Sequence, residues 1–320
     1  MNRTRIARRS MTWLILPALM ALFIVSCKPK GTTALKETPT SGDIVLGADE
    51  SFRLIVEAEV DTFTALYPYA TIRPVYTAEN ELVADFLNDS VRTIVSSWTP
   101  TDEQRELLLD VQTVVRTTIV AYDALALVLN RKNGDSLLTY ENVRDIFTGK
   151  ITDWNQINPK SRLGQINIVF DNIHSGNIRY FREKFELPEK LAPNFYAVNS
   201  NPEVIDYVAS SPAALGIVSV NWISDYEDPT SMSLQNRIKV AAVSLPYLDP
   251  NTFYMPVQGS IYDKTYPFVR EVVMNSRESF SGLGSGFVSF VAGEKGQRII
   301  LKSGLVPATM PIRIIQVKNE

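Results

Sequence analysis

Cysteine and histidine are almost absent from this chain. Its 320 residues include one cysteine, Cys27, and one histidine, His174. A single cysteine excludes a disulfide framework, and one residue of each kind is too few for a zinc site built from cysteine and histidine ligands. We therefore expect neither a structural metal nor a metal cofactor, and no pattern in the sequence indicates another cofactor.

An excess of basic residues is also missing. The chain has 32 Lys and Arg residues against 35 Asp and Glu residues, which gives a formal net charge of −3. Proteins that bind nucleic acid usually present a basic face that neutralises the phosphates. This balance argues against a nucleic-acid partner.

Long apolar runs are limited to residues 11–25, which follow four arginines and stop at Ser26 and Cys27. This run is shorter than the roughly 20 residues that a membrane-spanning helix needs. The arrangement is typical of a signal peptide, residues 1–26, which is removed from the mature protein. Loss of its four arginines leaves 28 basic residues against 35 acidic ones, a net charge of −7.

The residues around Cys27 read IVSC and resemble the lipobox of bacterial lipoproteins, in which the cysteine becomes the acylated first residue. Cys27 would then anchor the protein in the membrane through a lipid. Residues 27–42 are rich in Lys, Pro, Thr and Gly and indicate a flexible tether. The basic residues after the cysteine favour the periplasmic side of the cell envelope over surface export. An unmodified cysteine at the edge of an apolar segment is the alternative.

Strand and helix patterns alternate from residue 43 onward. Short β-branched runs separate stretches with apolar residues at helical spacing, which is typical of the α/β class, with a mostly parallel sheet covered by helices. The expected strands are residues 44–47, 71–76, 92–96, 166–170, 215–220 and 312–317, with further extended segments at 114–121, 124–130 and 238–245. The expected helices are residues 50–66, 78–87, 102–109, 140–147, 175–185, 202–209 and 286–303.

Two turns carry hydroxyl groups at predicted helix starts. Ser175, Gly176 and Asn177 precede one helix, and Ser51 stands in the equivalent place after the first strand. A helix start offers unpaired backbone N–H groups and a partial positive charge, which suit an anion. Open α/β sheets also bind ligands beyond the carboxyl ends of their strands. Each turn is equally compatible with an ordinary N-cap.

His174 beside Ser175 suggests a hydrolase at first sight. A general base must lie within about 3 Å of its nucleophile, whereas sequence neighbours on a turn usually point apart. The chain also lacks a Gly-x-Ser-x-Gly elbow. We therefore expect no hydrolase site at this turn, with His174 as a turn residue.

Four longer motifs carry a family resemblance: residues 136–157 (SLLTYENVRDIFTGKITDWNQI), the Ser-Gly-Asn turn, residues 212–220 (PAALGIVSV) and residues 296–307 (GQRIILKSGLVP). With these motifs the chain resembles the phosphate-specific substrate-binding proteins of ABC transporters, in the periplasmic-binding-protein superfamily. It looks most like their lipoprotein branch in Bacteroidetes-type bacteria. The resemblance spans residues 43–320. Trp154, within the first motif, is by itself best interpreted as a packing anchor.

The resemblance implies a two-lobed periplasmic-binding-protein fold of the type II-like kind, with hinged lobes that each contain a central mixed sheet flanked by helices. Lobe 1 would comprise residues 43–121 and 250–320, and lobe 2 residues 122–249. A ligand in the cleft contacts both lobes, so its binding energy favours closure.

The resemblance also implies a set of ligand-binding residues. Family members hold a dehydrated phosphate with hydroxyls and backbone N–H groups from three helix starts, one arginine and one aspartate that accepts a proton from the anion. Ser51 matches the first hydroxyl, and Ser175 and Gly176 match the central turn, with Asn177 where threonine is usual. Thr77 stands at the second helix start, where the usual glycines are missing.

The two charged positions depart from the family pattern. Arg92 stands where the aspartate is usual, and Asp171 where the arginine is usual. An exchange would still leave one cation and one carboxylate in the cleft. Our hypothesis is that Arg92 pairs with the anion while Asp171 accepts its proton. The same departure is equally consistent with a changed ligand.

The resemblance, together with the sequence pattern at Cys27, implies a monomeric, lipid-anchored solute-binding protein and not an enzyme. It would capture phosphate or a related small oxyanion and deliver it to the permease subunits of an ABC transporter. The alternative, favoured by the missing glycines at residues 76–80, is a family member with an altered ligand that acts as a sensor or a surface interaction lipoprotein. A hydrolase that uses Ser175 is disfavoured.

Overall fold

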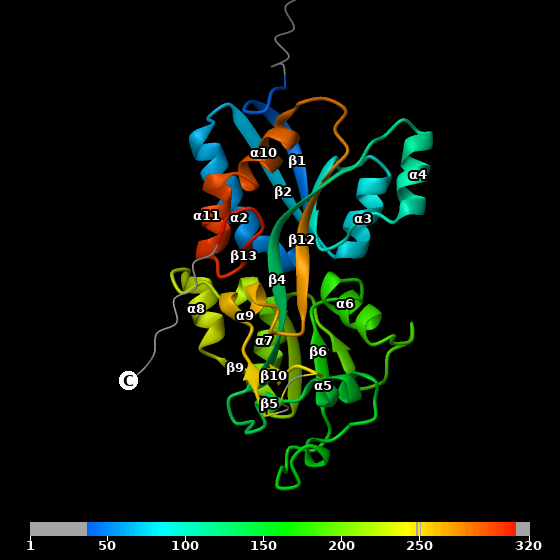
Figure 1. Cartoon of the computed structure of the whole chain (residues 1–320), viewed down its shortest axis with the longest axis vertical. Coiled ribbons are helices and arrows are strands. Elements are labelled where there is room, and N and C mark those ends of the chain that lie inside the picture. The colour runs from blue at the N-terminus through cyan, green and yellow to red at the C-terminus, as the bar shows by residue number, and fades with distance from the viewer. Residues whose placement is uncertain (1–36, 248, 250, 312–320) are drawn as a thin grey trace, which may run out of the picture. The chain divides into compact units, whose positions relative to one another are not determined.

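The longest strand, β4 (Arg116–Asn130), joins two groups of strands into one sheet (Figure 1). The computed structural model describes residues 37–247, 249 and 251–311. The first half of β4 pairs antiparallel with β12 (Val269–Ser276). Its second half pairs antiparallel with β8 (Ala214–Ser219) and β9 (Ile238–Val240). β4 is therefore shared by both groups.

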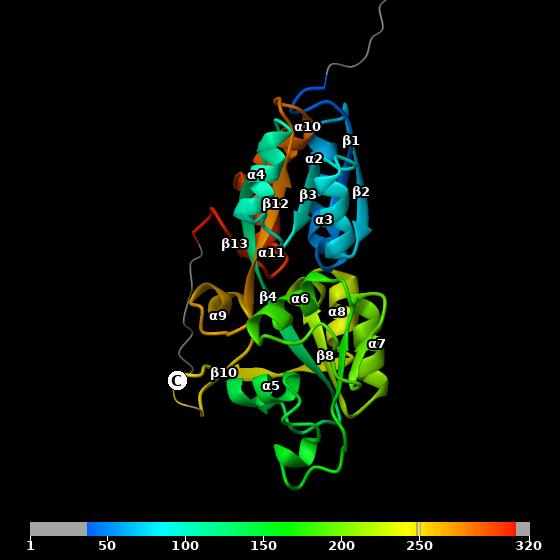
Figure 2. The same cartoon turned by 90° about the vertical axis from the view of Figure 1, so that its right-hand side faces the viewer.

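The first strand group runs in the order β2, β1, β3, β12 and β4, with β13 (Val306–Pro307) also on β4. β1 (Gly42–Asp49) is parallel to both β2 (Ala70–Thr77) and β3 (Thr93–Ser96), so the carboxyl ends of these three strands lie at one edge. α2 (Arg53–Leu66), α10 (Leu283–Val291) and α11 (Glu294–Lys302) pack together against this sheet (Figures 1 and 2). α2 is preceded by the short turn η1 (Glu50–Phe52).

The two faces of this sheet bury different side chains. On β3, Val95 belongs to the large core that α2 and α10 contribute to, whereas its neighbour Ile94 packs with Leu82 and Phe86 of α3 (Glu79–Leu87). Successive residues of a strand point to opposite faces, so α3 covers the face that α2 leaves open. A Cβ on Gly47 of β1 would lie 2.4 Å from Leu82 Cδ1, so glycine permits this close packing.

The second strand group consists of β4, β8, β6 (Asn167–Phe170) and β7 (Phe195–Ala197). β6 is parallel to β7 and β8. α7 (Asn201–Ser210) packs on β8, β6 and β4. The other helices of this group are α5 (Tyr140–Phe147), α6 (Gly176–Lys184) and α8 (Pro229–Gln235), and a small separate sheet contains β5 (Leu137–Leu138), β10 (Ala242–Ser244) and β11 (Phe253–Tyr254).

The remaining elements are short connections. α4 (Asp102–Asp110) follows β3, and Thr101 and Gln104 form a reciprocal capping box at its start. Between the strand groups lie α9 (Gln258–Tyr262) and the turn η3 (Val220–Trp222), both of which contact β4. The turn η2 (Trp154–Gln156) holds Trp154, whose side chain is fully buried and donates from Nε1 to the Ala213 carbonyl at 2.9 Å. The interpretation of Trp154 as a packing anchor is confirmed.

Up to residue 245 the predicted strands and helices are confirmed, with three local differences. Residues 50–66 begin as a 3₁₀ turn before α2, the segments 114–121 and 124–130 form the single strand β4, and residues 238–245 divide into β9 and β10. The predicted strand at residues 312–317 lies outside the described residues. β11 pairs with β10 in the small separate sheet.

The single long helix predicted at residues 286–303 is wrong. The structure has two helices, because α10 ends before Ala292 and α11 starts after Gly293. Gly293 has an extended backbone as the N-cap of α11, and glycine is the poorest helix former after proline. A Cβ on Gly296 would lie 2.5 Å from the Cα of Val291, so the two helices approach each other closely at this bend.

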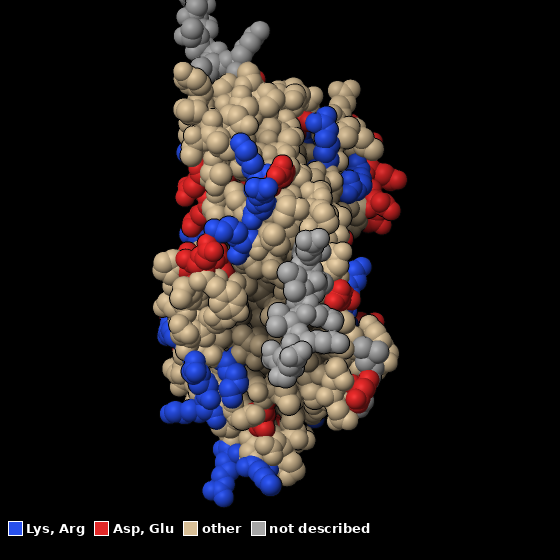
Figure 3. Space-filling model, turned by 60° about the vertical axis from the view of Figure 1, so that its left-hand side comes forward, with Lys and Arg blue, Asp and Glu red and all other residues tan. Residues whose placement is uncertain are grey.

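The molecular surface carries charges of both signs. On the face drawn in Figure 3, Lys and Arg side chains are interspersed with Asp and Glu and separated by uncharged surface. Within the described part of the chain, no helix has the length and apolar character needed to cross a bilayer.

Candidate functional site

Polar side chains gather where strands of both groups end. β1 ends at Asp49, β3 at Ser96 and β6 just before Asp171. Asp49, Ser96 and Asp171 are each at most 2% exposed. Buried carboxylates and hydroxyls need partners, so the contacts of these groups define the site.

The start of α6 forms a hydrogen-bonded cluster around Asp171. Ser175 caps the helix, with its Oγ accepting from the Ile178 N–H at 3.4 Å and donating to Asp171 Oδ1 at 2.6 Å. Asn177 Nδ2 donates to Asp171 Oδ2 at 3.0 Å, and Asn201 Nδ2 donates to the same oxygen at 3.3 Å. Burial, opposed by the bond from Ser175, raises the pKa of Asp171 to about 6.

Direct hydrogen bonds join the two strand groups here. Ser51 Oγ, at the start of the first helical segment, donates to Asn177 Oδ1 at 3.2 Å. Asn201 Nδ2 donates to Glu50 Oε2 at 2.8 Å. The Asn80 N–H donates to the carbonyl of His174 at 3.1 Å. The helix starts that the sequence singled out therefore meet across the cleft between the groups.

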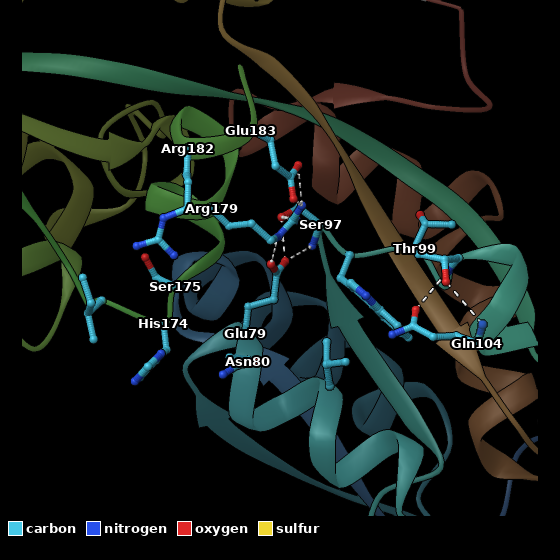
Figure 4. Close-up of a pocket in the computed structure, with 14 residues that line it drawn as sticks. Glu79, Asn80, Ser97, Thr99, Gln104, His174, Ser175, Arg179, Arg182 and Glu183 are labelled. Atoms are coloured by element: carbon cyan, nitrogen blue, oxygen red, sulfur yellow. Dashed lines mark hydrogen bonds and ion pairs between the residues drawn. The ribbon is translucent and has the colours of Figure 1, made fainter. Parts of the chain in front are cut away.

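Glu79 accepts hydrogen bonds from both strand groups. This residue opens α3, and its Oε1 accepts from Arg179 Nε at 2.5 Å (Figure 4). Its Oε2 accepts from the N–H of Ser97 at 3.0 Å and from the Ser97 hydroxyl at 2.7 Å. Burial raises the pKa of Glu79, but the charge of Arg179 and the donors outweigh it, so the pKa lies below its usual value. Glu79 is therefore ionised at neutral pH.

Arg179 extends this network toward solvent. Its Nη2 donates to Ser97 Oγ at 3.1 Å, and its Nη1 lies 3.0 Å from both carboxylate oxygens of Glu183, which is exposed. Arg179 belongs to α6, whereas Glu79 and Ser97 belong to the first strand group. The ion pair between Arg179 and Glu79 therefore bridges the groups, with Glu183 as a second partner on the outer side.

Asp49 is buried, and only one of its two carboxyl oxygens has a hydrogen-bond partner among the described residues. Its Oδ1 accepts from the Ser51 N–H at 2.8 Å, while its buried Oδ2 has no hydrogen-bond partner among the described residues. Burial and the nearby charge of Glu79 raise the pKa of Asp49 to about 7. Close to neutral pH this carboxyl therefore holds a proton for part of the time.

A second arginine, on β12, lies at the inner end of the site, where its charge acts on Asp49, Glu79 and Asp171. Arg270 Nε donates to Asp123 Oδ2 at 2.9 Å, and the two residues are paired across β12 and β4. Its guanidinium lies 4.8 Å from the centre of the Phe52 ring. Its Nη1 and Nη2 are buried without a hydrogen-bond partner in the described part of the chain. Burial raises the pKa of Asp123, although the charge of Arg270 opposes this.

An open cavity of about 640 Å³ adjoins the Glu79 cluster. It is lined by side chains of α3, of the segment after β3 and of α6, among them Glu79, Trp98, His174, Arg179 and Arg182 (Figure 4). Its volume falls in the range typical of small-molecule sites. Charged, neutral polar and apolar side chains therefore share the wall of this cavity.

A family model described as a PBP superfamily domain matches residues 33–295. The chain belongs to the PBP superfamily. The phosphate-binding protein PstS of Bacillus subtilis is 22% identical over 307 residues, which cover 92% of this chain and 94% of that protein. The phosphate-binding protein PstS of Borreliella burgdorferi is 20% identical over 205 residues, 62% of this chain and 67% of that protein.

Solved structures of this superfamily share the fold. A candidate phosphate ABC-transporter substrate-binding protein from Clostridium perfringens, solved with bound phosphate, has a TM-score of 0.70. It is 20% identical, and the match covers 83% of this chain and 100% of that chain. At this level of identity the likeness concerns the fold, and it confirms the two-lobed α/β fold of the PBP superfamily expected from the sequence.

Most of the residues predicted for a PBP-type site lie together. Ser51, Asp171, Ser175 and Asn177 are linked by hydrogen bonds. Gly176 starts α6 beside them. Thr77 ends β2, and its hydroxyl is buried without a hydrogen-bond partner within the described segments. Cys27 lies outside the described residues. Whether these side chains bind a ligand stays a prediction.

Arg92 is the exception, because it lies apart from this cluster. It precedes β3, at the opposite end of that strand from Ser96, and its side chain is 59% exposed. Its Nε lies 3.3 Å from Asp89 Oδ1 on the surface. The hypothesis of exchanged charges requires Arg92 to face the cleft. Arg92 instead lies at the far end of β3 from the cleft. Arg179 and Arg270 are instead the arginines whose charges act on Glu79.

Several functional groups were not found from the sequence. Glu79 and Arg179 are 100 residues apart, and Asp123 and Arg270 are 147 apart, so no local pattern pairs them. Glu79 could have been found from the sequence, because it lies in the first turn of the helix predicted at residues 78–87, close after a predicted strand. The Ser175 hydroxyl donates to Asp171 and not to His174, which lies in a turn as expected.

Proposed function

We propose that this chain is a solute-binding protein that captures phosphate or a related small oxyanion in the cleft between its lobes. It delivers the anion to the permease subunits of an ABC transporter and catalyses no reaction. Hydrogen-bond donors from both strand groups meet at the cleft, and this observation carries the proposal. Ser97 and Arg179 face each other at the start of α6, and Arg270 has unpartnered buried N–H groups at the inner end, within the part of the chain described.

These donors suit a tetrahedral oxyanion. Guanidinium groups and helix starts make charge-assisted hydrogen bonds to phosphate oxygens, which are stronger than bonds between neutral groups. Asp49, with its raised pKa, offers a carboxyl group that exchanges a proton with a monoprotonated anion near neutral pH. The proposed ligand-binding side chains are Ser51, Thr77, Asp171, Ser175, Gly176 and Asn177 from the sequence prediction, with Asp49, Arg179 and Arg270 added.

The envelope location forms part of the same proposal. Residues 1–26 serve as a signal peptide, Cys27 carries the lipid that anchors a monomer to the membrane, and residues 27–42 form the tether. The ligand-binding lobes then lie on the periplasmic side. Support comes from the sequence pattern at Cys27. The lobes proposed are residues 43–121 with 250–320, and residues 122–249.

Thermal unfolding with and without inorganic phosphate tests the function. A ligand present at about 100 times its dissociation constant adds roughly 2.7 kcal/mol to the free energy of unfolding. We expect a concentration-dependent rise of Tm with phosphate. An unchanged Tm up to millimolar phosphate would contradict the proposal.

A pair of matched variants separates binding from stability. Ser175 caps α6 and Ser200 caps α7, with Ser200 Oγ accepting from the Glu203 N–H at 3.3 Å. Loss of either cap costs about 1 kcal/mol of stability. We expect Ser175→Ala to weaken phosphate binding as well, measured by titration calorimetry, and Ser200→Ala to leave it unchanged.

A second candidate function rests on the charge of the cleft. Asp49, Glu50, Glu79 and Asp171 all lie at the site, and two of these carboxyl groups have a pKa close to neutrality. Such a site suits a changed ligand, in a protein that acts as a sensor or a surface interaction lipoprotein. A Tm that responds to another small molecule and not to phosphate would favour this candidate.

A further inference from the structure

The position directly above the start of α6 is filled by the protein's own acidic groups. A Cβ added to Gly176 would lie 2.8 Å from Glu79 Oε2, 2.8 Å from Ser97 Oγ and 2.9 Å from Asp49 Oδ2. These atoms therefore converge on the Cα of Gly176. Glu79 is 2% exposed and Asp49 is 1% exposed, so both carboxyl groups belong to the interior of the protein and not to its surface.

The carboxylate of Glu79 uses the donors that an oxyanion would use. It accepts from Arg179 Nε, from the Ser97 N–H and from the Ser97 hydroxyl. The start of α6, with its partial positive charge, lies against the same oxygen. A negatively charged group held by a guanidinium, a backbone N–H and a hydroxyl at a helix start is what an anion site contains when it is occupied.

The site also retains donors and acceptors that Glu79 does not satisfy. The buried Arg270 Nη1 and Nη2 and the buried Asp49 Oδ2 have no hydrogen-bond partners in the residues described. Buried polar atoms normally find a partner, and a guanidinium left with two unsatisfied nitrogens calls for an acceptor. Glu79 therefore fills the outer part of the site, while the inner part, next to Arg270, is unsatisfied.

We propose that Glu79 is a built-in competitor of the anionic ligand and so determines affinity and specificity. Its carboxylate occupies Arg179 and Ser97 at the start of α6, and an oxyanion gains these donors only by displacing it. This inference rests on the proposed function, because it concerns the same cleft. A monocarboxylate offers no more than Glu79 already provides, whereas a tetrahedral oxyanion has further oxygens for the buried N–H groups that Glu79 leaves unsatisfied. The competition therefore favours tetrahedral oxyanions over carboxylates.

Displacement of Glu79 also has a consequence for the lobes. Glu79 and Arg179 come from different strand groups, so their ion pair holds the groups together without a ligand. When an anion binds Arg179 in place of Glu79, the ligand and not the carboxylate connects the two strand groups. The closed arrangement is thus supported in both cases, and the ligand must outcompete a neighbour that is always present.

The experiment compares Glu79→Gln with Glu183→Gln in the full chain. Both substitutions remove one carboxylate partner of Arg179, but Glu183 lies on the outer side with a side chain 62% exposed, away from Gly176. The two variants therefore alter the charge around Arg179 alike, and only Glu79→Gln removes the negative charge from the start of α6. Calorimetric titration with inorganic phosphate and with acetate gives the affinities, and circular dichroism confirms folding.

We expect Glu79→Gln to bind phosphate at least about tenfold more tightly than the wild type, and Glu183→Gln to stay within about twofold. Acetate should bind measurably to Glu79→Gln alone. If Glu79→Gln fails to fold, Glu79→Ser removes the same carboxylate and is titrated in its place.

Three results would overturn the inference. If the wild type binds phosphate and Glu79→Gln binds it equally or more weakly, Glu79 is a ligand-positioning group and the proposed function stands. If Glu183→Gln improves affinity as much as Glu79→Gln, the effect is one of net charge and not of occupancy. If all the folded proteins fail to bind phosphate, the proposed function falls together with the inference.

Discussion

Two buried glutamates in the first strand group, Glu59 and Glu79, have pKa values shifted in opposite directions. Each is 2% exposed. Glu59 lies on α2 among apolar side chains such as Val120 and Phe287, and neither of its oxygens has a partner within the described chain. Burial alone raises its pKa to about 8. Glu79 is buried to the same extent, yet Arg179 and Ser97 keep its pKa below the usual value.

The comparison shows that partners, and not depth, decide whether a buried carboxyl is charged. Desolvation acts on both residues in the same direction, and three donors reverse it at Glu79. At physiological pH, Glu59 is mostly a neutral group in an apolar core, whereas Glu79 is an anion in a cleft. Two further buried carboxyls lie between these extremes: Asp123 is paired with Arg270, and Asp49 has one satisfied oxygen and one unsatisfied oxygen.

The largest effect is expected where a buried pair is broken. Asp123→Asn leaves Arg270, whose side chain is 4% exposed, without its counter-ion. Loss of one partner of a buried ion pair costs about 3 to 5 kcal/mol. We expect urea unfolding to show a destabilisation of this size. The control is Asp206→Asn, which breaks an exposed pair with Arg237 and should cost under about 1 kcal/mol. Equal costs for the two variants would contradict the buried-pair account.

The next effect concerns the unpaired glutamate. The folded pKa of Glu59, about 8, lies above its ordinary value of 4.5. The folded state therefore binds a proton more tightly than the unfolded state, and stability is lost as pH rises from about 4.5 to 8. Glu59→Gln removes this loss and should raise the free energy of unfolding by about 2 to 4 kcal/mol at pH 9, with little change at pH 4.

Urea unfolding at both pH values checks this prediction. Glu57→Gln serves as the control, because Glu57 lies on the same helix with a side chain 47% exposed. A Glu59→Gln variant that is no more stable at pH 9 than at pH 4, relative to wild type, would show that Glu59 finds a partner in solution.

A smaller effect of the same sign is expected for Asp49. Its folded pKa, about 7, exceeds the ordinary value of 3.8, so its contribution to stability falls between about pH 4 and pH 7. Asn at this position keeps an acceptor for the Ser51 N–H. We expect Asp49→Asn to raise Tm at pH 8 by an amount equivalent to about 1 to 2 kcal/mol, and less at pH 5. A lower Tm at pH 8 would mean that the ionised carboxylate is needed.

The smallest effect is expected for Arg92→Ala. The surface pair between Arg92 and Asp89 is worth under about 1 kcal/mol. Because Arg92 lies away from the cleft, phosphate affinity should match that of the wild type within about twofold, measured by calorimetry. A tenfold loss of affinity would restore the original hypothesis that Arg92 binds the anion.

The sequence predicted the fold well because the α/β pattern is local. Apolar periodicity identified the strands that end at the cleft, and Ser175 identified a helix start. It failed at residues 286–303, where the apolar pattern continues across Gly293 and only the close packing of Gly296 on Val291 shows the bend.

The site was predicted only in part because its charges pair over long distances. The turn at Ser175 was found from its own residues, and its hydrogen bonds to Asp171 and from Ser51 follow from the strand ends. The assignment of Arg92 rested on counting back along β3, which ignores which end of the strand faces the cleft. The pairing of Glu79 with Arg179 depends on two strand groups meeting, and this cannot be read from either segment alone.

The most direct test of the account is a carboxyl ¹³C NMR titration of Glu79 and Glu59 with pH, repeated with inorganic phosphate. The account predicts a pKa below 4.5 for Glu79 and about 8 for Glu59, with the Glu79 signal alone shifting when phosphate is added. A Glu79 that titrates at or above its ordinary value, or that is unmoved by phosphate at a concentration that saturates binding, would contradict it.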